Sequence, residues 1–150
     1  MKMKKIVKIS IIALLVGCTA FTFSGCGKYE DGPSISLLTK KARVAGTWGV
    51  EKYMVNGVDQ TAAWRQVYSS ENLIFDKAGT YSATYNTILG PFTDAGTWAF
   101  INDKANLQLI SSSANSVADV WEIIRLTNSE LWVRETGSIT TADEFHYMSK

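Results

Sequence analysis

The sequence of 150 residues is poor in cysteine, proline and histidine, with two, two and one of them respectively. Both cysteines, Cys18 and Cys26, lie near the N-terminus, so the rest of the chain has no thiol for a disulfide, a nucleophile or a thiolate metal site. Four of the fifteen basic residues lie in the first eight positions, which leaves eleven against fourteen acidic residues and a net charge of −3. Because a nucleic-acid partner calls for a clustered basic face, we expect none.

The N-terminus has the organisation of a secretory signal peptide. Lysines at positions 2, 4, 5 and 8 precede an almost uncharged stretch, residues 9–23, that ends in small residues. This stretch is too short for a membrane span, which needs about 20 apolar residues. We therefore predict a signal peptide over residues 1–25.

Two tetrapeptides resemble a bacterial lipobox, in which a cysteine is acylated and becomes the new N-terminus. They are Leu15-Val16-Gly17-Cys18 and Phe23-Ser24-Gly25-Cys26. Cleavage before Cys18 would leave an apolar mature terminus, whereas cleavage before Cys26 leaves a polar one, so Cys26 is the favoured lipidation site and Cys18 the less favoured. Two unmodified cysteines in a cleaved signal are the remaining interpretation. Acyl chains such as palmitate would bind the membrane with about 0.8 kcal/mol per buried methylene.

A polar segment follows Cys26. Residues 26–43 are predicted to form the lipidated terminus and a flexible tether, in which the cluster Lys40-Lys41-Ala42-Arg43 is solvated or lies near anionic headgroups. Lys28, followed closely by Glu30 and Asp31, resembles the acidic export signal of surface lipoproteins in Bacteroidetes-type bacteria. We expect an exported protein, lipid-anchored to the outer membrane on its periplasmic or cell-surface side.

Residues 44–150 are predicted to form one domain, whose core five tryptophans help to fill. Short β-rich runs alternate with turn residues, and the clearest alternation has Tyr81, Ala83 and Tyr85 between hydroxyl side chains. We predict one helix over 62–70 and a longer loop over 87–94 that contains Gly90-Pro91. The eight predicted strands cover 46–55, 72–76, 80–86, 95–101, 106–112, 120–126, 131–135 and 144–149.

Short connections between these strands are typical of antiparallel neighbours. Eight such strands predict an all-β, up-and-down antiparallel barrel, because closure removes the exposed edges of an open sheet. A two-sheet sandwich is the alternative, although the long crossover connections that it needs are missing. The interior of an eight-stranded barrel is filled by side chains or holds one small ligand.

Several phrases of the sequence resemble those of lipocalins. Gly46-Thr47-Trp48 resembles the Gly-x-Trp signature, in which the tryptophan packs across one end of the barrel, so Gly46 and Trp48 would be structural. The later phrases are residues 75–81, 96–100 and 126–131, and the series resembles the lipocalin-like lipoproteins of Bacteroidetes. The resemblance implies a barrel with a generic capacity for an apolar ligand, but no retinoid-type or haem-type pocket, and we expect no cofactor. Neither Arg125 nor Arg134 is favoured as the arginine that lipocalins stack on this tryptophan.

Residues with catalytic or metal-binding chemistry are sparse. Glu144 and His146 would share one face of the last strand, with Asp143 adjacent, which is the minimal geometry for a metal or acid–base pair. Such residues more often point outward into water. The sequence contains no Ser-His-Asp arrangement, nucleotide loop or carboxylate pair with supporting spacing, so we predict no enzyme, no catalytic residues and no metal site.

The aromatic residues are the candidates for ligand binding. Those expected to point inward, where they line a cavity or simply fill the barrel, are Tyr81, Tyr85, Trp98, Phe100, Phe145 and Tyr147. Trp64, on the predicted helix, could form a lid over one mouth or plug it. One hypothesis is a membrane-anchored protein that binds a small apolar or amphipathic ligand near Trp64. The other is a structural or adaptor module with a filled barrel, which meets a protein or glycan through outward residues such as Trp121 or Trp132.

Overall fold

The computed structural model describes residues 37–137 and 141–150, and the predicted signal peptide, Cys18 and Cys26 lie outside these ranges. Within them lie nine strands, two short α-helices and one 3-10 helix. None of the described helices is long and apolar enough to cross a membrane. In chain order the elements are α2 (Lys40–Val44), β1 (Gly46–Val55), β2 (Val58–Asp59), α3 (Thr61–Val67), β3 (Tyr68–Phe75), β4 (Thr80–Thr87), β5 (Gly90–Ile101), η1 (Asn102–Lys104), β6 (Asn106–Ser111), β7 (Asp119–Leu126), β8 (Glu130–Glu135) and β9 (Asp143–Ser149).

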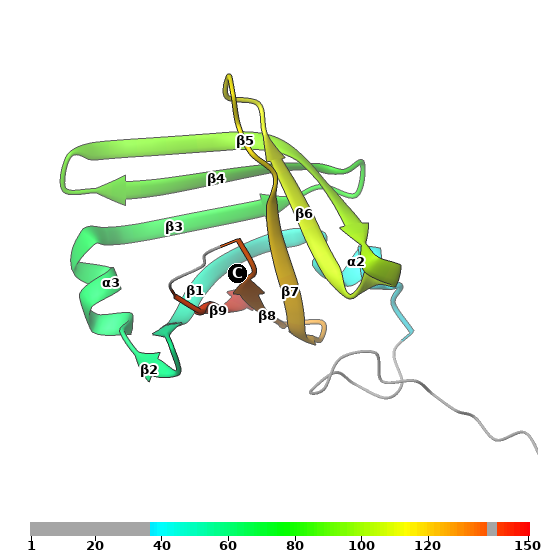
Figure 1. Ribbon diagram of the computed structural model, residues 1–150, viewed down its shortest axis with the longest axis horizontal. Coiled ribbons are helices and arrows are strands. Elements are labelled where there is room, and N and C mark those ends of the chain that lie inside the picture. The colour runs from blue at the N-terminus through cyan, green and yellow to red at the C-terminus, as the bar shows by residue number, and fades with distance from the viewer. Residues whose placement is uncertain (1–36, 138–140) are drawn as a thin grey trace, which may run out of the picture.

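The sheet closes on itself. From β3 to β9 each strand pairs antiparallel with the next along the chain, β1 pairs with β3, and β9 returns to pair with β1. Strand β2 pairs only with the end of β1, so eight strands form the closed barrel. The predicted up-and-down barrel is confirmed, and closure excludes the sandwich. Figure 1 shows β3, β4 and β5 running side by side, with α3 near one end of β3 and α2 near the other.

Strand alternation explains the core. In β4 the side chains of Tyr81 and Ala83 are buried while those of the residues between are not, as the sequence pattern predicts. The same period of two selects Leu73 and Phe75 in β3. The buried core thus consists of one inward-facing side chain from every second position of the strands.

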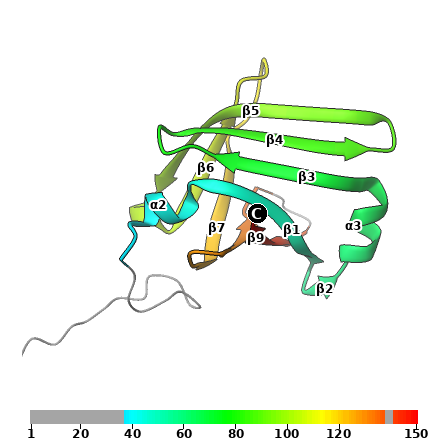
Figure 2. The ribbon, with the colours of Figure 1, turned by 180° about the vertical axis from the view of Figure 1, so that it is seen from behind.

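Helix α2 covers one end of the barrel, which Figure 2 shows from behind. Residues 40–43, expected as part of a solvated tether, instead belong to this helix, and Arg43 is buried with its Nη1 donating to the Leu126 carbonyl at 2.8 Å. Trp48 is buried and its indole Nε1 donates to the Val44 carbonyl at 2.8 Å. The tryptophan of the Gly-x-Trp signature therefore packs at this closed end. The helix forms because the barrel end offers an apolar surface for Val44 and a carbonyl for Arg43.

The prediction of a long loop over 87–94 is wrong. Strand β4 continues to Thr87 and β5 begins at Gly90, so only Ile88 and Leu89 form the turn. The Thr87 hydroxyl donates to the Gly90 carbonyl at 2.8 Å, and Gly90 takes a φ of +115°, which glycine adopts at little cost. Pro91 is tolerated because this part of β5 pairs with β4 but not with β6.

The predicted helix is present but shorter at its end. It begins at Thr61 and ends at Val67, after which Tyr68 starts β3. Residues 68–70 belong to β3 because they pair with β4, and this tertiary pairing overrides the local helix preference. The two-residue strand β2 was not predicted.

Trp48 provides a test of the closed end. We expect Trp48→Phe to lower the free energy of unfolding by about 2 to 3 kcal/mol, since it removes both buried volume and the hydrogen bond to Val44. Urea denaturation measures this loss. As a control, Trp64→Phe on the half-buried face of α3 should cost less than about 1 kcal/mol. Equal losses for the two variants would contradict the placement of Trp48 in the closing contact.

Candidate ligand-binding site

The interior of the barrel has an apolar half at the α2 end. Trp98 packs there against Phe75 and Phe100, with ring centroids 5.4 and 5.6 Å apart, and its indole donates to the Asp76 carbonyl at 2.9 Å. These contacts belong to the continuous hydrophobic core. In this half the aromatic side chains fill the barrel.

The structure places the predicted aromatic residues on the inner face but does not gather them in one place. Tyr81, Trp98 and Tyr147 are buried, and Tyr85, Phe100 and Phe145 are partly buried against the core. Trp98 and Phe100 belong to the filled half. Tyr85 and Phe145 lie toward the opposite end, which we call the open half, near the ends of β4 and β9 that are distant from α2.

The open half is lined by five carboxylates. The sequence considered alone pointed to one of them, Asp143, only as a neighbour of Glu144 and His146, and did not reveal the other four. All five pair across the sheet with inward-facing residues, and each comes from a different strand. The five are Glu71 on β3, Asp94 on β5, Asp119 on β7, Glu135 on β8 and Asp143 on β9. The available signal was strand alternation, which gives Glu71 the same face as Leu73 and Phe75. It was overlooked because charged residues near strand ends usually face solvent.

Asp94 is the best satisfied of these carboxylates. It accepts hydrogen bonds from the Ser111 hydroxyl at 2.5 Å and the Tyr81 hydroxyl at 2.6 Å. Burial acts to raise the pKa of Asp94, but these two donors and the Ala95 amide outweigh it, so the pKa is lowered. Asp94 is therefore ionised and its acceptors are used within the protein.

Glu71 has the opposite environment. Its side chain is 5% exposed, and Oε2 has no hydrogen-bond partner. Burial raises the pKa of Glu71 to about 7, although the Lys150 ammonium, the Val50 amide and the Tyr85 hydroxyl act to lower it. Burial and the nearby Asp119 and Asp143 likewise raise the pKa of Glu135 to about 7.

Helix α3 lies over an opening in the barrel wall. Strands β1 and β3 pair only over Gly46–Trp48 of β1, and beyond this point α3 contacts both of them. A recess of about 310 Å³ at this place is lined by Val50, Trp64, Tyr68 and Glu71 among others. A second recess, of about 450 Å³, reaches from Trp64 to Tyr53 and Val55. Trp64 thus lies between both recesses, close to the inner face.

Aromatic rings connect α3 to the open half. Trp64 stacks on Tyr68 at 4.9 Å between centroids, Tyr68 meets Tyr85 at 5.8 Å, and Tyr85 meets Phe92 at 6.2 Å. On the facing strands Phe145 lies between Tyr53, at 4.7 Å, and Tyr147, at 5.8 Å. The open half therefore combines carboxylates with aromatic faces.

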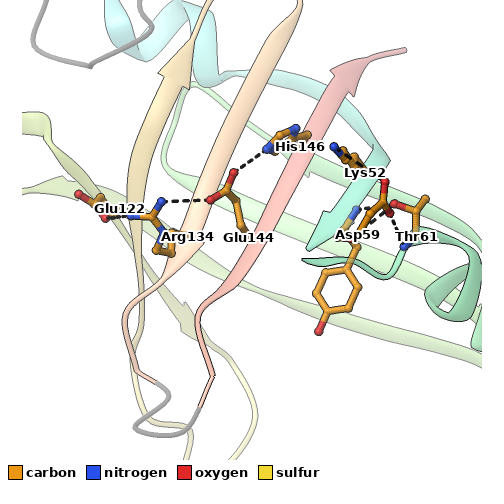
Figure 3. A network of polar contacts seen from close by, with 8 residues as sticks. Lys52, Asp59, Thr61, Glu122, Arg134, Glu144 and His146 are labelled. Atoms are coloured by element: carbon orange, nitrogen blue, oxygen red, sulfur yellow. Dashed lines mark hydrogen bonds and ion pairs between the residues drawn. The ribbon is translucent and has the colours of Figure 1, made fainter. Parts of the chain in front are cut away.

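Glu144 and His146 point outward, as expected, but they are not simply solvated. His146 Nε2 lies 2.7 Å from Glu144 Oε1, and the imidazole stacks on Trp132 with centroids 4.0 Å apart. Glu144 also forms an ion pair with Arg134, which in turn forms an ion pair with Glu122, in the network of Figure 3. Among the described residues no three acidic, histidine or cysteine side chains are grouped to hold a metal ion.

Arg125 and Arg134 lie on the outer face of the barrel, whereas Trp121 lies inside it. Arg125 lies over the Trp132 ring, at 5.0 Å from its centroid, and Arg134 binds two carboxylates, so both belong to the outer face. The expectation that Trp121 faces outward is wrong, because its register on β7 with Leu107 turns it into the core, where it is 7% exposed.

The raised pKa values predict a stability that depends on pH. The folded chain holds protons on Glu71 and Glu135 up to a pH of about 7, whereas the unfolded chain loses them near the ordinary value of 4.5, so stability falls as pH rises from about 4.5 through 7. We expect Glu71→Gln to gain at least about 1 kcal/mol over the parent at pH 8 and little at pH 4.5. Urea denaturation at both pH values measures this, with the exposed Glu51→Gln as control. An unchanged pH dependence in the Glu71 variant would contradict the assignment.

Comparison with known proteins agrees with this geometry. No curated protein matches the chain. The lipocalin-like domain family matches residues 44–133, a range that runs from the end of α2 through most of β8. This range is more than half of the chain and includes the Gly-x-Trp signature and the aromatic residues of β4 and β5. The chain therefore belongs to the lipocalin-like domain family.

Proposed function

We propose that this protein binds a small apolar or amphipathic ligand in the open half of its barrel and acts as a binding protein, not an enzyme. The observation that carries the proposal is the pair of recesses beside Trp64. Inner-face residues line both of them, Val50 and Glu71 in the recess between β1 and β3, and Tyr53 and Val55 in the other. Ligand sites of this kind are concave and mostly apolar, with a few placed polar groups. Membership of the family supports a barrel suited to this task, although fold alone does not fix function.

A neutral fluorescent probe, N-phenyl-1-naphthylamine, tests the proposal. We expect its fluorescence to rise on binding, and Trp64→Ala to weaken binding about tenfold because the residue lines both recesses. Trp132→Ala, on the outer face, is the matched control and should bind as the parent does. Native mass spectrometry of the purified protein should also show a copurified small molecule. If the probe does not bind and no small molecule copurifies, the proposal is overturned.

We also propose that the protein is an exported lipoprotein of the type found in Bacteroidetes, anchored to the outer membrane through acylated Cys26. The lipobox-like Phe23-Ser24-Gly25-Cys26 and the polar residues after it support this site over Cys18. A multiply acylated terminus would hold the barrel permanently at a membrane.

Metabolic labelling with an alkyne analogue of palmitate tests the anchor. We expect the parent and Cys18→Ser to be labelled and to fractionate with membranes, and Cys26→Ser to lose both the label and the membrane association. Label lost with Cys18→Ser but retained with Cys26→Ser would reassign the site to Cys18. No label in any of the three would refute the anchor.

One observation favours the second function, an adaptor that meets a protein or glycan partner. The turn between β4 and β5 exposes Ile88 and Leu89 at 80% and 94%, and Phe92 nearby is 57% exposed. A filled barrel without a probe-binding site, together with this apolar tip, would support the adaptor instead.

A further inference from the structure

The inference concerns the chemistry of the ligand and rests on the proposed function. Its starting point is the Glu71 carboxylate, which is 95% removed from solvent and has an Oε2 that no donor reaches. A buried acceptor without a partner carries a free-energy cost, which is larger when the group is charged. Asp94 on β5 shows that the barrel can supply hydroxyl donors to a carboxylate, yet it supplies none to Glu71 Oε2.

The charges around Glu71 are unequal in sign. The charged side chains that face inward in the described part of the open half are all carboxylates, namely Glu71, Asp94, Asp119, Glu135 and Asp143. Asp143 repeats the pattern, since its Oδ1 is buried without a partner while Oδ2 accepts from the Tyr53 hydroxyl at 3.1 Å.

Two cations line the recess that contains Glu71, and both are bound elsewhere. Lys150 donates its ammonium to the backbone carbonyl of Glu71 and to Asn72 Oδ1. Arg65 on α3 donates to the backbone carbonyl of Glu51 at 2.9 Å. Neither places a hydrogen bond on Glu71 Oε2.

Aromatic residues surround the same carboxylate. Tyr85 on β4 and Tyr147 on β9 are close enough to couple electrostatically with Glu71, and Tyr68 and Trp64 line the recess from the other side. Aromatic faces beside a carboxylate are the surroundings in which proteins bind ammonium groups, through cation–π attraction and charge. The partly buried Val50, Tyr85 and Phe145, which pack against the core, offer an apolar surface for a hydrocarbon chain.

We propose that the ligand is a small organic cation: an ammonium group that lies against Glu71 between the tyrosines, with an apolar chain directed along the inner face of the barrel. Entry is past Trp64, through the gap between β1 and β3. The cation satisfies the acceptor that the protein leaves open.

Proton linkage supports this assignment. At neutral pH Glu71 is only partly ionised, because burial raises its pKa to about 7. A bound cation favours the ionised form, so binding at pH 7 releases protons and affinity rises from pH 5.5 to pH 8. The other titratable groups around Glu71 are Tyr85 and Tyr147, which interact with it electrostatically, Glu135, which interacts with both tyrosines, and the recess-lining Arg65 and Lys150.

Isothermal titration calorimetry of the purified protein with octyltrimethylammonium, octanol and octanoate tests the ligand class. We expect the ammonium to bind about tenfold or more tightly than the other two at pH 8, since only its charge is opposite to that of the ionised Glu71. Glu71→Gln should remove this preference, and the outer-face Glu51→Gln should keep it. Lys150→Met should strengthen ammonium binding, because it removes a competing positive charge.

The outcomes separate the two proposals. Octanol or octanoate binding as tightly as the ammonium, or unchanged ammonium affinity in Glu71→Gln, would overturn the cationic ligand and leave the barrel as a site for apolar molecules. If none of the three compounds binds, the cationic ligand is overturned. The naphthylamine probe then decides whether the proposed function fails as well. If Glu71→Gln does not fold, the dependence of the measured enthalpy on buffer ionisation tests the parent instead: ammonium binding at pH 7 should release protons, and binding without proton release would overturn the cationic ligand.

Discussion

Pairing of β9 with β1 turns an antiparallel sheet into a closed cylinder, and the separation of inside from outside depends on it. Along this seam a register shift between Val50 and Lys52 keeps Tyr53 facing inward opposite Phe145. Because side chains alternate strictly, closure gives every second residue of eight strands one shared interior. The carboxylates of the open half, which come from five separate strands, thereby face the same interior.

The two ends of the barrel serve different purposes. At one end Val44, Trp48 and Arg43 provide a packed closure, in which backbone carbonyls accept from Trp48 Nε1 and Arg43 Nη1. At the other end β1 and β3 separate beneath α3, so the wall is interrupted where Glu71 lies. Buried polar atoms without a partner occur at both ends, Arg43 Nε at the first and Glu71 Oε2 at the second, but only Glu71 Oε2 belongs to a residue that lines a recess.

The outer face shows how a suggestive sequence pattern can have a structural explanation. Glu144 and His146 share a face as their spacing predicts, but they join Arg134 and Trp132 in a chain of ion pairs and stacked rings. Inside the barrel a residue without any suggestive sequence pattern has an unusual environment. Glu71, an unremarkable glutamate in the sequence, is the residue whose environment most needs a ligand.

The sequence by itself determined the eight strands of the barrel and their antiparallel order, because alternation and short turns act locally, and the resemblance of Gly46-Thr47-Trp48 to the lipocalin signature predicted the role of Trp48. It also placed the aromatic residues of β4 and β9 on the inner face. Only the tertiary structure decided that Arg43 and Trp121 are buried and that carboxylates from five strands face one interior. The physical reason is that register across the sheet, not order along the chain, sets which charged side chains lose water and which remain without a partner.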